Sequence, residues 1–282
     1  MRVDLSLGVT LAVLGAALLH ATWNALVKSG SDPVLDTALV ALGSSAAVLP
    51  FLAVVPPPEA PAWRWLVASS VIHVGYFTAL ARAYRAGDLS HGYPIMRGVA
   101  PLIVALSAFA WFGEAPGTAM WAGVLLICGG VLSLGLVGLD WRRSHAATGW
   151  ALGNAAIIAA YTLVDAAGVR AAGGAERYVV WVFFFMGLPY ALLVLSLRRR
   201  EFSRHARRHW RRGLFGGACV VASYGIALWA MTRAPVAVIA ALRETSVVFG
   251  ALIGAWLLKE GHVRRRLTGA AAVLAGVIAL KL

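Results

Sequence analysis

Long apolar runs, separated by short polar or Pro- and Gly-containing connections, occupy nearly the whole chain. An α-helix needs about 20 residues to cross a hydrocarbon core of ~30 Å, and each run is close to that length. We predict ten membrane-spanning helices, at residues 5–28, 33–55, 62–86, 89–112, 117–139, 147–170, 177–197, 210–233, 235–258 and 265–281. The expected fold class is therefore an all-α membrane protein.

The composition agrees with a membrane location and limits the classes of partner that the protein can bind. Hydrophobic residues make up 60% of the chain and charged residues 13%, with a mean hydropathy of +0.78, which leaves too few charges for a water-exposed surface. The net charge is +13, and the basic residues that produce it cluster at the ends of the apolar runs. They do not form a face with interleaved aromatic residues, which argues against nucleic-acid binding. Membrane lipids and a small-molecule substrate are the expected partners.

The distribution of Lys and Arg predicts how the chain is oriented. The connections after the first, third, fifth, seventh and ninth spans hold 17 of these residues, whereas the termini and the other connections hold 6. Because basic connections stay in the cytoplasm, we predict a multi-pass protein of a bacterial inner membrane with both termini outside. The basic stretch 198–212 is interpreted as a topology determinant touching anionic headgroups, in preference to a dedicated lipid or partner site.

Residues 88–138 and 234–282 repeat each other. A constant shift of 146 aligns Arg97 with Arg243, Glu114 with Glu260, Gly123 with Gly269, and Gly130 with Gly276. The chain therefore divides into two units, 1–140 and 141–282, of five predicted spans each. Since five is odd, the second unit enters the membrane from the opposite face. Two inverted repeats are typical of secondary transporters, whose substrate site lies near the midplane between the halves.

Two arginines fall inside predicted spans. A charge there costs at least ~2.5 kcal/mol and must face protein or water. Arg97 and Arg243 each lie eight residues, about 12 Å, from the start of their span, so spans entering from opposite faces bring both close to the midplane. Pro101 leaves the Arg97 carbonyl without its helical donor. We favour contact with substrate over pairing with a buried carboxylate, for which Glu244 and Asp165 are the candidates.

Other polar and aromatic candidates occupy matching positions in the two units. Asp165 aligns with Asn24, and Tyr76 with Tyr224; the tyrosines either line a cavity or simply pack. The candidates are His20, Trp23 and Asn24 on the first span, Tyr76 on the third, Tyr93 beside Arg97, Tyr161 and Asp165 on the sixth, and Tyr224 and Trp229 on the eighth. The positions near Lys28 and Arg170 are expected to form outer vestibules, and His20 is expected to be a hydrogen-bonded core histidine rather than a proton carrier.

Both repeat endings carry a family likeness. WFGE at 111–114 and LLKE at 257–260, each followed by two aligned glycines, resemble the repeat ending of the EamA family of the drug/metabolite transporter superfamily. The resemblance implies ten transmembrane helices around a central cavity, and transport of amino acids, other metabolites or toxic compounds, usually outward, without a cofactor. The segment 91–102 is similar to a subgroup associated with phosphonate use.

We therefore predict an exporter of a small anionic or zwitterionic metabolite, such as an amino acid. Arg97 and Arg243 would hold the anionic group, and Glu244 or an aromatic side chain would hold the amine. A flippase for a lipid-linked group and an uptake permease for a phosphonate are the alternatives. An enzyme is not expected, because the chain has no HExxH motif, P-loop or His/Cys metal cluster. Close helix packing at the glycines is expected within the chain, which favours a monomer.

Overall fold

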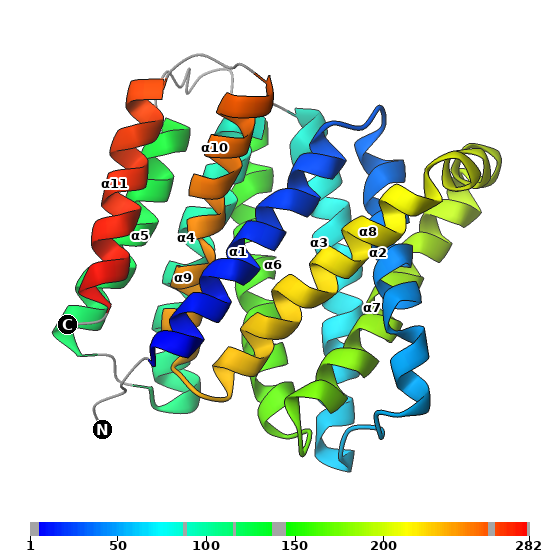
Figure 1. The fold of residues 1–282 in the computed structure, drawn as a ribbon, viewed down its shortest axis with the longest axis horizontal. Coiled ribbons are helices and arrows are strands. Elements are labelled where there is room, and N and C mark those ends of the chain that lie inside the picture. The colour runs from blue at the N-terminus through cyan, green and yellow to red at the C-terminus, as the bar shows by residue number, and fades with distance from the viewer. Residues whose placement is uncertain (1–5, 87–88, 115–116, 137–144, 259–262, 281–282) are drawn as a thin grey trace.

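The computed structural model describes residues 6–86, 89–114, 117–136, 145–258 and 263–280, and over these residues the secondary structure is helical (Figure 1). An all-α protein is confirmed. The α-helices are α1 (Leu7–Lys28), α2 (Pro33–Val48), α3 (Trp63–Ala86), α4 (Leu89–Phe112), α5 (Thr118–Leu136), α6 (His145–Arg170), α7 (Ala175–Leu197), α8 (Arg199–Met231), α9 (Val236–Arg243), α10 (Thr245–Leu258) and α11 (Val263–Ala279), with short 3₁₀ turns η1 (Leu49–Ala53) and η2 (Ala60–Ala62).

Three predicted spans differ from the helices observed. The span 33–55 ends as the 3₁₀ turn η1, where Pro50 cannot donate a helical hydrogen bond. Helix α8 begins at Arg199, eleven residues before the predicted start, and bends at His209. The span 235–258 is two helices, α9 and α10, separated at Glu244, whose N–H bonds back to Ala241 O in a tighter turn.

Six of the described helices are long and apolar enough to cross a membrane: α1, α2 with η1, α4, α6, α7 and α8. Thr118–Ser133 of α5 and Gly269–Ala279 of α11 form shorter apolar helices. The split between α9 and α10 divides a further predicted span into two pieces. Ten crossings therefore remain a prediction, while a multi-pass helical architecture is established.

Helices from the two halves of the chain interleave. α1 packs against α8, α9 and α10, and α6 packs in the corresponding way against α3 and α4. α2 lies between α7 and α8, and α5 lies beside α11 at one edge of the bundle (Figure 1). The buried apolar residues of both halves form a common core. Helices of both halves therefore contribute side chains to the interior of the bundle.

Glycines bring α5 and α11 into close contact. A Cβ on Gly123 would lie 2.9 Å from the carbonyl oxygen of Gly276, and a Cβ on Gly276 would lie 2.8 Å from that of Gly123. Two turns further along α5, a Cβ on Gly130 would lie 3.0 Å from Gly269 O. The small residues let the backbones approach as expected from the sequence, and the packing joins the last helices of the two halves.

Replacing Gly123 with Ala should lower the stability of the folded protein by about 1–3 kcal/mol, because the added methyl group forces α5 and α11 apart. Gly129→Ala is the matched control, since a Cβ there meets nothing within 4 Å and alanine favours the helix by about 0.5–1 kcal/mol. Thermal unfolding of both variants in detergent measures the difference. Equal midpoints would show that the α5–α11 contact does not depend on glycine.

Candidate functional site

Buried polar side chains gather in the interior of the bundle. They come from α3, α4, α6 and α8 and from the break between α9 and α10, and they include His73, Arg97, Asp165, Arg243 and Glu244. Burying so many polar groups is unfavourable unless they interact with one another or with a ligand. Their contacts therefore indicate which of them are already paired within the protein.

Arg97 is paired with Glu244. Arg97 Nε lies 2.7 Å from Glu244 Oε2, and each side chain is only 4% exposed. These two atoms lack the alignment of a hydrogen bond, so the contact is chiefly an electrostatic attraction. Arg97 Nη2 also donates a hydrogen bond to Ser246 Oγ at 3.4 Å. For Arg97, the structure therefore has the pairing with a buried carboxylate that the sequence analysis ranked below substrate contact, and the ion pair ties α4 to the α9–α10 break.

Arg243 has a different environment. Its guanidinium carbon lies 4.6 Å from the centroid of the Tyr224 ring, and the residue is buried. Among the residues that the structure describes, no carboxylate lies within ion-pair distance of it. The adjacent Glu244 belongs to Arg97, as the ~100° between neighbouring positions on a helix allows. The direct contact that the structure gives this cation among the described residues is the ring of Tyr224, so its N–H groups remain as donors for an anion.

Aromatic rings surround Tyr161 of α6. The ring centroids of His73, Tyr76 and Tyr224 lie 4.4 Å, 5.4 Å and 5.8 Å from that of Tyr161. The spacing and tilts are those of favourable aromatic pairs. Tyr76 and Tyr224, which the sequence left as cavity-lining or packing residues, thus join one ring cluster, and Tyr224 also faces Arg243.

Asp165 fixes the position of two tyrosines. Its Oδ1 accepts a hydrogen bond from Tyr178 Oη at 2.8 Å, and its Oδ2 accepts one from Tyr224 Oη at 2.7 Å. The residue is fully buried. The ring that lies against Arg243 is therefore held at its hydroxyl end. An outer vestibule at Tyr161 and Asp165 was expected, but Tyr178 of the next helix packs over this end of α6, so both residues lie in the interior.

The candidates on α1 bond chiefly to one another. Trp23 Nε1 donates to His20 Nδ1 at 3.3 Å, and Asn24 Nδ2 donates to the carbonyl of His20 at 2.8 Å. His20 is thus the hydrogen-bonded histidine that the sequence favoured. Trp229 has Arg233 over its ring at 4.6 Å, close to the end of α8. Tyr93 is half-buried against the apolar core.

Three residues of this cluster were not among the candidates taken from the sequence: His73, Ser246 and Tyr178. His73 lies three positions before Tyr76 on α3, so the helical face of Tyr76 would have indicated it. Ser246 lies three positions after Arg243, so extending that helical face would have found it. Tyr178 had no comparable signal, because it reaches Asp165 only after the chain turns back between α6 and α7. Its position in a predominantly apolar helix made it indistinguishable from a packing residue.

A second polar group closes one end of the bundle. Glu114 Oε1 pairs with Arg170 Nη2 at 2.7 Å, and Glu114 Oε2 accepts a hydrogen bond from Val236 N at 2.9 Å. Arg170 Nε in turn donates to Met231 O at 3.0 Å. These contacts join the end of α4 to α6, α8 and α9, so Glu114 anchors the end of its helix. Its repeat partner, Glu260, lies outside the described residues.

Comparisons with known proteins agree with this architecture. The sequence pattern of the EamA-like transporter family matches residues 7–136 and again 146–282. A solved structure described only as "Crystal structure of protein" matches with a TM-score of 0.75 at 18% identity, over 97% of this chain and 96% of its own. At that identity the likeness shows the fold alone. Curated proteins give no match.

Proposed function

Because the chain belongs to the EamA-like transporter family, we propose that it is a secondary transporter that exports a small anionic or zwitterionic metabolite, such as an amino acid. The observation that carries this proposal is the buried guanidinium of Arg243, which has an aromatic face beside it and no carboxylate partner among the described residues. A carboxylate on the substrate would complete the site through charge-assisted hydrogen bonds.

In this proposal the two arginines have different roles. Arg243 binds the anionic group, whereas Arg97, already neutralised by Glu244, holds α4 against the α9–α10 break. The rings of Tyr76 and Tyr161 offer π-faces to an amine or an apolar side chain of the substrate. A helix interrupted beside the substrate site is a recurrent feature of secondary transporters, and the interruption at Glu244 fits it.

In this proposal, substrate crosses the membrane by alternating access, in which the two inverted repeats exchange conformations. The reciprocal packing of α1 on α8 and of α6 on α3 supports the inversion inferred from the sequence. Contacts between the halves close each end of the bundle: Glu114 with Arg170 at one end, and Asp32 with Arg198 at the other. In each half-cycle one of these contacts opens while the other holds. The excess of Lys and Arg at the Arg198 end supports a cytoplasmic location for that end and an outside location for both termini.

A ligand screen tests this function. Amino acids and other carboxylates should raise the apparent melting temperature of the purified protein, because a ligand at 100 times its Kd stabilises the folded state by about 2.7 kcal/mol. Polyamines and quaternary amines should have no effect, since Arg243 repels a cation. Phosphonates in the same screen test the uptake alternative. Stabilisation by cations alone would contradict an anion site at Arg243.

A further inference from the structure

The first turns of α8 carry a dense positive surface. Six arginines there are exposed and form what we call the arginine face: Arg199, Arg200, Arg204, Arg207, Arg208 and Arg211. The inner side of the same turns is occupied by Phe202, which is buried against apolar residues of α2 and α7. The segment is therefore an amphipathic helix with one packed side and one cationic side.

The exposed side of α8 changes character within one turn. After Arg211 the next large exposed side chains are apolar: Leu214 is 39% exposed and Phe215 is 56% exposed. Trp210, which is 54% exposed, lies between the arginines and these apolar residues. The guanidinium carbon of Arg211 lies 5.3 Å from the centroid of the Trp210 ring. Arginine followed by tryptophan and then by exposed apolar side chains is the order met on passing from lipid headgroups to acyl chains. This order is the one expected for an arginine face at headgroup depth.

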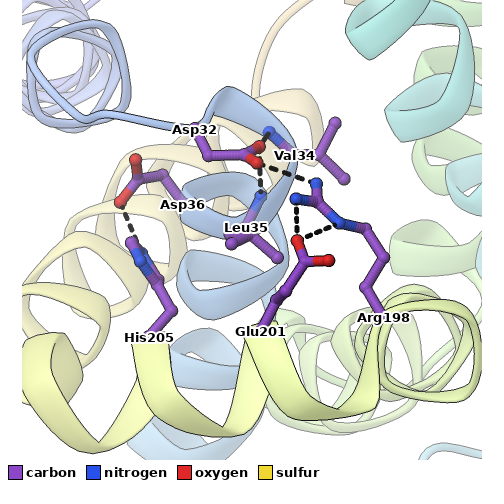
Figure 2. Close-up of polar contacts among 7 residues, drawn as sticks. All are labelled: Asp32, Val34, Leu35, Asp36, Arg198, Glu201 and His205. Atoms are coloured by element: carbon purple, nitrogen blue, oxygen red, sulfur yellow. Dashed lines mark hydrogen bonds and ion pairs between the residues drawn. The ribbon is translucent and has the colours of Figure 1, made fainter.

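An ion pair to Asp32 and a His205–Asp36 hydrogen bond hold this helix against α2 (Figure 2). Arg198 Nη1 lies 2.7 Å from Asp32 Oδ2, and Arg198 also contacts Glu201. One turn further on, His205 Nε2 lies 3.0 Å from Asp36 Oδ1. The acidic groups near the segment thus engage residues at its base and on its inner side, and leave the arginine face without a matching layer of carboxylates among the described residues.

The electrostatics at the base of α8 favour a fixed helix. Burial alone would raise the pKa of the Asp32 carboxyl. Hydrogen bonds from Arg198 and from the N–H groups of Leu35 and Val34 outweigh burial and hold the pKa below its ordinary value. Asp32 therefore stays ionised at neutral pH and keeps its contact with Arg198. A rigid support of this kind preorganises the exposed arginines.

We propose that the arginine face of α8 binds the headgroups of anionic phospholipids in the leaflet at this end of the bundle. The charges are complementary, guanidinium groups suit phosphate oxygens, and the adjoining apolar residues place the face where headgroups lie. Each arginine near an anionic membrane surface strengthens binding by roughly fivefold. A soluble acidic partner is disfavoured because the exposed apolar side chains of Leu214 and Phe215 follow the arginine face directly along α8 and suit an acyl-chain environment.

Native mass spectrometry of the detergent-purified full chain tests this proposal. Phosphatidylglycerol should bind tightly enough to persist as adducts, and phosphatidylcholine should bind at least tenfold more weakly. Replacing Arg207 and Arg208 with Gln should weaken phosphatidylglycerol binding by tenfold or more and leave phosphatidylcholine unchanged. Millimolar inorganic phosphate or glycerophosphate should not displace the lipid; displacement would assign the face to a free phosphate compound and overturn the proposal.

The matched control is the double variant Arg64→Gln and Arg233→Gln. These arginines are exposed at the start of α3 and the end of α8, at the end of the bundle opposite the arginine face (Figure 1). The control should bind phosphatidylglycerol as the unaltered protein does. An equal loss in both double variants, or equal binding of the two lipids by the unaltered protein, would overturn the proposal. If the Arg207 and Arg208 variant unfolds, the double variant Arg200→Gln and Arg204→Gln provides the same comparison.

Discussion

Replacing Arg243 with Ala should reduce transport of a carboxylate substrate by at least ~30-fold in proteoliposomes. The expected loss is about 2 kcal/mol or more, the scale for removing one partner of a buried, hydrogen-bonded charge pair. The melting temperature should fall by less than in the Glu244→Gln variant described below, because no described carboxylate lies within ion-pair distance of Arg243. Substrate flux and thermal unfolding are measured on the same preparations.

Two further variants sharpen this prediction. Arg243→Lys keeps the positive charge but loses the planar fork, so partial transport with weaker apparent affinity is expected. Arg233→Ala removes an exposed arginine that lies over Trp229 and should leave flux unchanged. Normal flux in the Arg243→Ala variant would mean that its guanidinium does not contact the substrate.

Replacing Glu244 with Gln should lower the stability of the protein by ~3–5 kcal/mol. The amide keeps the shape of the side chain but strands the buried positive charge of Arg97, and uncompensated buried charges have costs of this size. Thermal or denaturant unfolding in detergent measures the loss. Glu176→Gln, which changes an exposed acid on α7, should shift stability by less than about 0.5 kcal/mol.

A double variant separates an ion pair from two independent contributions. Arg97→Met combined with Glu244→Gln removes both charges, so it should be more stable than Glu244→Gln alone. Additive losses would contradict the pairing. Together with Arg243→Ala, these variants assign opposite behaviour to the two repeat-related arginines: loss of stability follows from disturbing the Arg97 pair, and loss of transport follows from removing Arg243.

Helix positions were largely predictable because the membrane imposes its own length on apolar runs. Helix α4 begins and ends at the residues expected from the sequence. The break between α9 and α10 was not predictable in the same way. No Pro or Gly lies at Glu244, and the ion pair made there is with Arg97 of another helix. Likewise, the basic stretch at 198–212 was expected as a connection, but Phe202 gives it a buried side and it folds as helix.

The arginine pair was visible in the repeat, whereas the difference between its members required the contacts. At the repeat position of Glu244 the first half has Gly98, where an added Cβ would meet Leu132. One glutamate cannot neutralise both arginines. The sequence therefore already indicates that Arg97 and Arg243 differ in their charge partners. Which arginine takes the carboxylate depends on side-chain geometry across helices, and adjacency along the chain suggests the wrong partner.

The pairing of one glutamate with one of two arginines also bears on the ancestry of the molecule. A homodimer of identical halves brings every group to its symmetry axis in duplicate, so the net charge gathered there is an even number. Gene duplication and fusion remove that restriction, since each half then mutates alone. Glu244, whose repeat position in the first half is Gly98, is such a difference: it pairs with Arg97 and leaves Arg243 without a carboxylate partner among the described residues.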